Sequence, residues 1–216
     1  MSFTGIAGLG GLGFVLVAIT VNVVYVRARL PLPVSDKDLE AITDDFAAVG
    51  DALKRPSVIV PASWLCATVF AAGLLSELWS GGSGPGAWAL VGFAGVLLQN
   101  ATFTCVEALR FGMAAAAARD RGSVAGLWGL SNVLFGFNQV FLAIALLGFT
   151  AAGSTAGLFP TWQTWLGYGS AALLFAASSA APYNVGGTNR FAPVGLIGWL
   201  GWIIWIVSGS VTLIRL

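Results

Sequence analysis

The side chains with the greatest capacity for chemistry lie in one apolar stretch, Ala87–Ala108, and just beyond its end. They are Gln99, Asn100, Thr104, Glu107 and Arg110. The last four are separated by steps of four, three and three residues, which places them along one face of a helix. Glu107 and Arg110 are spaced to form an ion pair on that helix. Alternatively, Glu107 is a proton or cation site at the base of a cavity, because ionisable groups inside a membrane span are candidates for function.

The next apolar stretch, Val124–Thr150, contributes three more amides, which are Asn132, Asn138 and Gln139. A short loop joins the two stretches, so we expect antiparallel neighbouring helices that bring Asn138 and Gln139 to the depth of the amide pair at 99–100. These four amides either hydrogen-bond across the two helices or form the polar floor of a pocket for a small molecule or lipid. In the pocket interpretation, four phenylalanines supply apolar walls: Phe103, Phe135, Phe137 and Phe141.

The residue types of common catalytic and metal sites are scarce in this sequence. The chain has no histidine, which removes the commonest metal ligand and the commonest general base. Its two cysteines, Cys66 and Cys105, fall in separate apolar stretches, and no lysine lies within such a stretch. We therefore expect no metal and no cofactor, and we favour a non-enzymatic protein. The formal net charge of +1 argues against a nucleic-acid partner.

The elements that position these residues follow from the composition. Hydrophobic residues make up 57% of the chain and charged residues 9%, whereas soluble domains carry about 25% charged residues. So few charged residues cannot cover a water-facing surface. We therefore expect most of the protein surface to face the lipid bilayer. We predict one all-α polytopic membrane helix bundle over residues 1–216, with a glycine-rich break at Ser80–Gly86. It has about six transmembrane helices: Phe3–Val26, Ser57–Trp79, Ala87–Ala108, Val124–Thr150, Thr161–Ala181 and Pro193–Ile214.

Basic residues occur in alternate loops. The loops after the first, third and fifth spans hold arginine or lysine, whereas the loops after the second and fourth hold no charged residue. Basic loops face the cytoplasm, so we expect cytoplasmic odd-numbered loops and both termini outside. No positive charge precedes the span Phe3–Val26, which is typical of an uncleaved span rather than a signal peptide. The expected location is the cytoplasmic membrane of a prokaryote.

One segment, 36–54, has the pattern of an amphipathic cytoplasmic helix between the first two spans. Ser35 and Asp38 resemble a capping box, and Pro56 is expected to stop the helix. Its apolar stripe follows steps of three and four residues and consists of Leu39, Ile42, Phe46, Val49 and Leu53. The stripe can pack against the bundle itself, bind a partner protein or lie on the membrane surface. Six acidic residues between Asp36 and Asp51 disfavour the membrane surface, since anionic lipid would repel them.

Two classes of function remain open. In the first, the protein binds a small apolar or amphipathic ligand, a lipid or a partner subunit through the polar patch between the third and fourth spans. In the second, it is a small secondary transporter with Glu107 as its coupling site. Either protein could form a homodimer in the bilayer.

Overall fold

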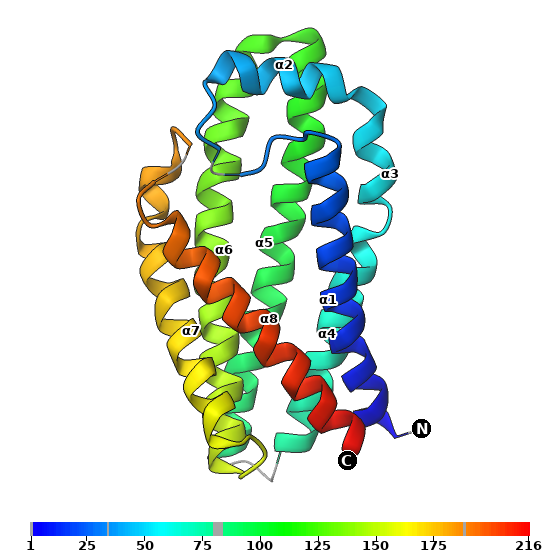
Figure 1. The fold of residues 1–216 in the computed structure, drawn as a ribbon, viewed down its shortest axis with the longest axis vertical. Helices are drawn as coiled ribbons and strands as arrows, with labels where there is room; N and C mark the ends of the chain where they lie inside the picture. Colours follow the sequence, from blue (N-terminus) through cyan, green and yellow to red (C-terminus); the bar gives the residue numbers. More distant parts are fainter. Residues whose placement is uncertain (1, 34, 80–83, 188) are drawn as a thin grey trace.

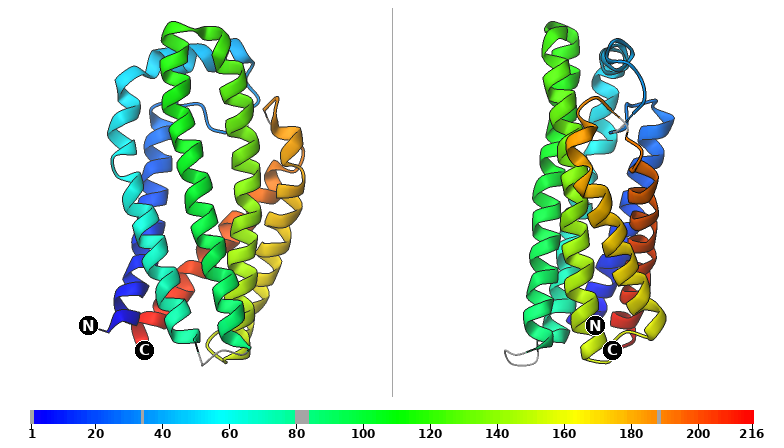
Figure 2. Two further views of the ribbon diagram at one scale, coloured as in Figure 1. Left: turned by 180° about the vertical axis from the view of Figure 1, so that it is seen from behind. Right: turned by 90° about the vertical axis from the view of Figure 1, so that its left-hand side faces the viewer.

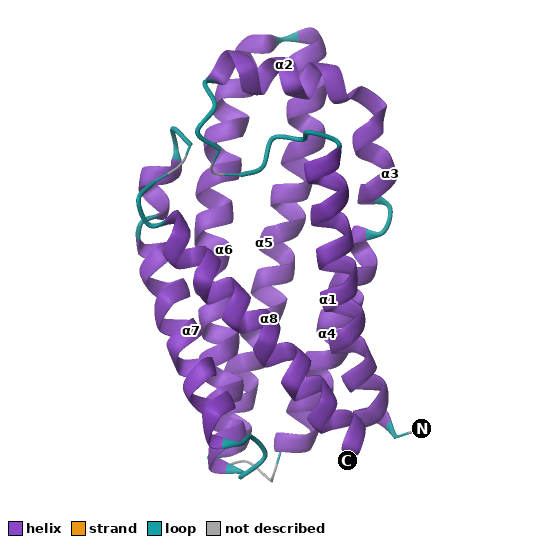
Figure 3. Cartoon of the chain, in the orientation of Figure 1, coloured by secondary structure: helices purple, strands orange, loops and turns teal. Residues whose placement is uncertain are grey.

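The computed structural model describes residues 2–33, 35–79, 84–187 and 189–216, and every regular element in those ranges is a helix (Figure 1, Figure 3). This confirms the predicted all-α membrane bundle. Of the glycine-rich break expected at 80–86, residues 80–83 lie outside the described ranges. The long helices are α1 (Phe3–Arg27), α4 (Val60–Leu78), α5 (Pro85–Arg119), α6 (Val124–Thr155), α7 (Thr161–Ser179) and α8 (Ala192–Arg215). Shorter elements are α2 (Leu39–Val49), η1 (Gly50–Leu53), α3 (Lys54–Ser57), η2 (Arg121–Ser123) and η3 (Ala181–Asn184).

Five helical segments in the described ranges are long and apolar enough to cross a membrane. They are Phe3–Arg27, Lys54–Leu78, Pro85–Arg119, Arg121–Thr155 and Ala192–Arg215. Helix α7, which covers the fifth predicted span, runs beside α6 and α8 in both views of Figure 2 but is not among the five. Its first turn is polar, because it carries Thr161, Gln163 and Thr164. Five segments of the described ranges therefore qualify as spans by hydropathy, and α7 packs among them as a sixth long helix.

Glycines bring two pairs of helices close together. A Cβ atom on Gly148 of α6 would lie 2.2 Å from the backbone nitrogen of Gly92 on α5, so only glycine fits there. Near the chain termini, a Cβ atom on Gly8 of α1 would lie 2.6 Å from the carbonyl oxygen of Ser210 on α8. Small residues at such crossings let the two backbones approach closely. Close van der Waals packing matters here because the hydrophobic effect does not drive helices together within lipid. The α5–α6 crossing confirms the expected antiparallel neighbours.

Helix α2 lies across one end of the bundle (Figure 1). Its buried side chains Ile42 and Phe46 pack against Met113 of α5 and against Val124 and Trp128 of α6. We call these five residues and the helix ends that carry them the cap. Two exposed ion pairs accompany this packing, but exposed pairs contribute little to stability, so the apolar contact holds α2 in place.

The amphipathic segment is shorter and more broken than the sequence predicts. Helix α2 begins at Leu39 rather than at 36, because the carboxylate of Asp38 accepts a hydrogen bond from the backbone N–H of Ala41 at 2.8 Å and caps the helix. It ends at Val49 and continues as η1 and α3. Pro56 does not end the helix, since it lies inside α3 and the chain bends only at residues 58–59.

Exposed tryptophans indicate where the bilayer lies along the bundle. Trp79, Trp88, Trp162 and Trp165 are exposed at the ends of α4, α5 and α7 that lie near the chain termini, as in an interfacial aromatic belt. Counting about 1.5 Å per residue from Trp88, Arg110 lies about 33 Å away, at the opposite boundary of a hydrocarbon layer about 30 Å thick. Helix α5 is not confined to the predicted span but continues to Arg119, so the cap lies beyond the hydrocarbon.

Candidate functional site

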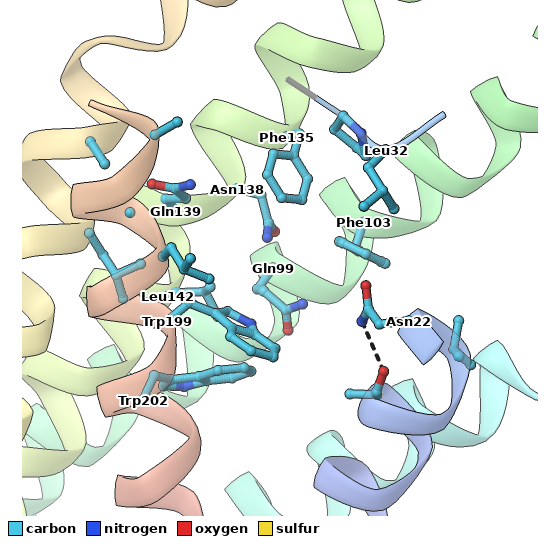
Figure 4. A pocket seen from close by; sticks show the side chains of 18 of the residues that line it. Asn22, Leu32, Gln99, Phe103, Phe135, Asn138, Gln139, Leu142, Trp199 and Trp202 are labelled. Atoms are coloured by element: carbon cyan, nitrogen blue, oxygen red, sulfur yellow. Dashed lines mark hydrogen bonds between the residues drawn. The ribbon is translucent and has the colours of Figure 1, made fainter. Parts of the chain in front are cut away.

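A cavity of about 400 Å³ lies in the half of the bundle nearer the cap, and α1, α4, α5, α6, α7 and α8 all contribute to its lining (Figure 4). This volume falls within the range of sites that hold small molecules. The main polar side chains of the lining are Gln99, Arg110, Asn138, Gln139, Asn184 and Asn189. The main aromatic side chains are Phe103, Phe135, Trp199 and Trp202.

The amides of α5 and α6 form one wall of this cavity. Figure 4 shows the side chains of Gln99 and Asn138 pointing into the same space, with Gln139 one residue further along α6. The carbonyl oxygens of the Asn138 and Gln139 side chains accept no hydrogen bond from any residue that the structure describes. Asn138 is only 5% exposed, so its free oxygen is a buried acceptor without a donor. Such a group costs free energy until a donor reaches it.

The opposite wall comes from α1 and α8 and is mainly apolar, although Asn22 and Tyr25 of α1 also line it. Trp199 and Trp202 of α8 face the amides across the cavity in Figure 4, and the rings of Phe14 and Trp202 meet edge to face with centroids 5.2 Å apart. Gly195 lets α8 approach the polar wall, because a Cβ atom there would lie 2.7 Å from the Gln139 side-chain oxygen. The cavity therefore presents hydrogen-bonding groups on one side and flat aromatic surface on the other.

Glu107 lies in a buried cluster at the edge of the cavity. Its carboxylate accepts hydrogen bonds from the Tyr25 hydroxyl and, at 2.7 Å, from the Ser57 hydroxyl. Its other oxygen lies 3.2 Å from the guanidinium of Arg110, which confirms that these two residues are spaced to pair. The Arg110 guanidinium also stacks 4.5 Å above the Tyr25 ring centroid. Three helices, α1, α3 and α5, thus meet at one acid.

Three of the predicted ligand-binding residues lie away from the cavity. Asn100 faces α4, where its side-chain N–H₂ donates to the Trp64 carbonyl at 3.2 Å and to the Thr68 hydroxyl at 3.0 Å. Thr104 is exposed on the outer surface and its hydroxyl donates back to the helix backbone. Asn132 is fully buried but is not part of the lining. The four amides are therefore not one group: three line the cavity and one holds α4 to α5.

Two of the four phenylalanines expected as apolar walls lie outside the cavity lining. Phe103 and Phe135 line the cavity, whereas Phe137 is 42% exposed on the outside of α6 and Phe141 lies outside the lining. The reason is helical geometry: Phe137 precedes Asn138 directly, so the two side chains point about 100° apart.

The apolar stripe proposed as a partner surface is occupied within the chain itself. Ile42 and Phe46 are buried in the cap, and Leu53 packs beside Tyr25 in a second cluster. Val49 is partly buried and only Leu39 is largely exposed. The partner-binding interpretation is therefore not supported for the buried residues, because contact with α5 and α6 already removes them from solvent.

Sequence reasoning missed several contributors to the site, among them Tyr25, Asn184, Asn189 and Trp199. The two asparagines lie in the connection between α7 and α8, where their side chains bond to each other. Nothing local in the sequence marks that connection as part of a site. Tyr25 could have been identified from the sequence. It is a lone polar aromatic residue in the last turn of an apolar helix, and Arg27 and Arg29 follow it within four residues.

Comparisons with protein-family models, with curated proteins and with solved structures find no match. The chemistry of the cavity alone therefore informs the function.

Proposed function

We propose that this protein is a non-enzymatic membrane protein that binds a small amphipathic molecule in the cavity between α1, α8 and the α5–α6 pair. The observation that carries the proposal is the buried, unbonded acceptor of Asn138 on the wall of a cavity of about 400 Å³. A bound molecule with a hydrogen-bond donor removes the cost of that acceptor, and its apolar part covers the aromatic wall.

The proposal includes the orientation expected from the loops. Residues 28–33, 120–123 and 180–187 all lie at the cap end in Figure 1, and the two termini lie at the other end. With the basic loops in the cytoplasm, the cavity lies in the cytoplasmic half of the membrane.

The transporter interpretation has less support from the site. Each oxygen of Glu107 already contacts a hydroxyl or the Arg110 guanidinium, and the acid is only 4% exposed. A coupling site must exchange its proton or cation with a water-filled path. The Glu107 carboxylate is instead fixed by its contacts to other side chains, as in a structural ion pair. Proton-linked uptake by proteoliposomes that is lost in Glu107→Gln would restore the transporter interpretation.

Two substitutions of neighbouring amides test the binding function with opposite expected results. Asn138→Leu removes the acceptor, so the molecule that co-purifies with the protein should bind about tenfold more weakly, while stability stays the same or rises. Asn100→Leu removes two hydrogen bonds to α4, so stability should fall by about 1 kcal/mol with binding retained. Native mass spectrometry reports the bound mass, and thermal unfolding in detergent reports stability. A wild-type protein without a bound molecule, or equal loss of binding in both variants, contradicts the proposal.

A further inference from the structure

The two walls of the cavity formed by α1 and α8 are in contact from the chain termini as far as Phe14 and Trp202, whose ring centroids lie 5.2 Å apart. Gly8 and Gly11 of α1 pack against Ser210 of α8 at that end. From there the two helices diverge toward the cap (Figure 1), and Figure 4 shows Trp199 of α8 and Asn22 of α1 on opposite sides of the open space. Both helices are long and apolar enough to span a membrane, and side chains of both line the cavity.

The height of the cavity matches one leaflet. Its lining on α1 extends from Phe14 to Tyr25, a rise of about 16 Å. Half of a hydrocarbon layer is about 15 Å. The amides Gln99 and Asn138 lie near the mid-membrane end of this height, just above Trp199 and Trp202 in Figure 4. A polar group bound there is deep in the membrane and is reached more directly from the bilayer than from water.

The charge of the site favours an uncharged ligand. Arg110 is the one acidic or basic side chain among the described lining residues, and its charge is balanced by Glu107 at 3.2 Å. The remaining polar lining is amide and hydroxyl. A charged ligand would leave an unbalanced charge in a medium of low polarity, which is costly.

The amide wall requires donors and the opposite wall suits a flat ring. The oxygens of Asn138 and Gln139 both need a hydrogen-bond donor, as a hydroxyl supplies. Aromatic side chains surround these amides, with Phe135 above Asn138, Phe103 to the right of it and Trp199 below in Figure 4. Aromatic rings bind another ring through offset or edge contacts.

We infer that the ligand is a lipid-soluble quinol, an uncharged ring with hydroxyl donors whose single apolar tail leaves the cavity between α1 and α8. This assignment rests on the proposed binding function and specifies its ligand class. The ring lies between the amides and the aromatic wall, its hydroxyls donate to Asn138 and Gln139, and the tail extends into the lipid.

Three compounds with one ring and one tail test the role of the donors: 2-decyl-1,4-hydroquinone, its oxidised quinone and its di-O-methyl ether. The hydroquinone should bind the detergent-purified protein at least about tenfold more tightly than the other two, because only it supplies donors. Titration calorimetry under anaerobic conditions measures the dissociation constants. Equal binding of all three compounds, or tighter binding of the quinone, overturns the assignment.

Two matched substitutions on α8 test the route of the tail. Leu196 lines the cavity at the gap and is 58% exposed, whereas Leu200 is 49% exposed but lies outside the lining. Leu196→Trp should weaken decylhydroquinone binding about tenfold by filling the gap, and should leave the tail-less hydroquinone unchanged. Leu200→Trp should change neither. If Leu196→Trp affects both compounds equally, or neither, the tail does not pass between α1 and α8.

The outcomes also separate this assignment from the function on which it rests. If no hydroquinone binds but native mass spectrometry still finds a molecule that Asn138→Leu loses, the ligand class is wrong and the binding function stands. If the wild-type protein carries no molecule and binds none of these compounds, both fail.

Discussion

Glu107→Ala should lower the free energy of unfolding by about 3–5 kcal/mol, the loss typical of breaking one partner of a buried ion pair. The substitution leaves the Arg110 guanidinium buried without its counter-charge, and it removes the acceptor for the hydroxyls of Tyr25 and Ser57. Three helices lose their common contact at once. Unfolding by sodium dodecyl sulfate in mixed micelles measures the change.

Two further variants show whether the ion pair causes the effect. The double variant Glu107→Leu, Arg110→Leu should recover much of the stability, because replacing both partners with apolar groups removes the unpaired charge. Glu77→Ala, at an exposed acid near the far end of α4, should have no measurable effect. An unfolding curve for Glu107→Ala that overlays the wild-type curve would show that the cluster contributes nothing to stability.

Gly148→Ala should destabilise the bundle by about 3 kcal/mol or more, near the upper end of the effects of overpacking. The added methyl group would lie 2.2 Å from the backbone nitrogen of Gly92, and a backbone atom cannot move aside as a flexible side chain can. The α5–α6 pair must then separate along much of its length, which also displaces the amide wall. Thermal unfolding and gel filtration in detergent measure the loss.

Gly126→Ala is the matched control for this prediction. Gly126 lies on the same helix, α6, and a Cβ atom there meets nothing within 4 Å. The same chemical change should therefore raise stability by about 0.4–1 kcal/mol, because alanine restricts the unfolded chain more than glycine does. Similar effects at both positions would mean that the α5–α6 crossing is not tightly packed.

The sequence predicts the features of this fold that depend on composition and helical period. Few charges and long apolar stretches indicate the membrane bundle, and the spacing of Glu107 and Arg110 indicates their pairing. The sequence also identifies Gln99, Asn138 and Gln139, since amides are conspicuous in apolar helices. In each case the information lies within one helix or in one loop length.

The features that could not be predicted depend on how helices rotate against one another. Gln99 and Asn100 are adjacent and chemically alike, but a helix turn of about 100° sends one to the cavity and the other to Thr68 of α4. The contribution of α8 to the cavity depends on the angle at which α8 crosses the other helices. No single residue of α8 determines that angle. For the same reason the sequence left open whether α2 contacts its own bundle or a partner.

The position of the cap beyond the hydrocarbon means that two solvents act on one chain. Burial of Ile42 and Phe46 removes apolar surface from water, so the hydrophobic effect stabilises the cap. The glycine crossings below it depend on close van der Waals contact, because lipid tails are as apolar as the side chains that they replace. Urea should therefore loosen α2 at concentrations that leave the spans intact, whereas a harsh short-chain detergent should separate the spans first.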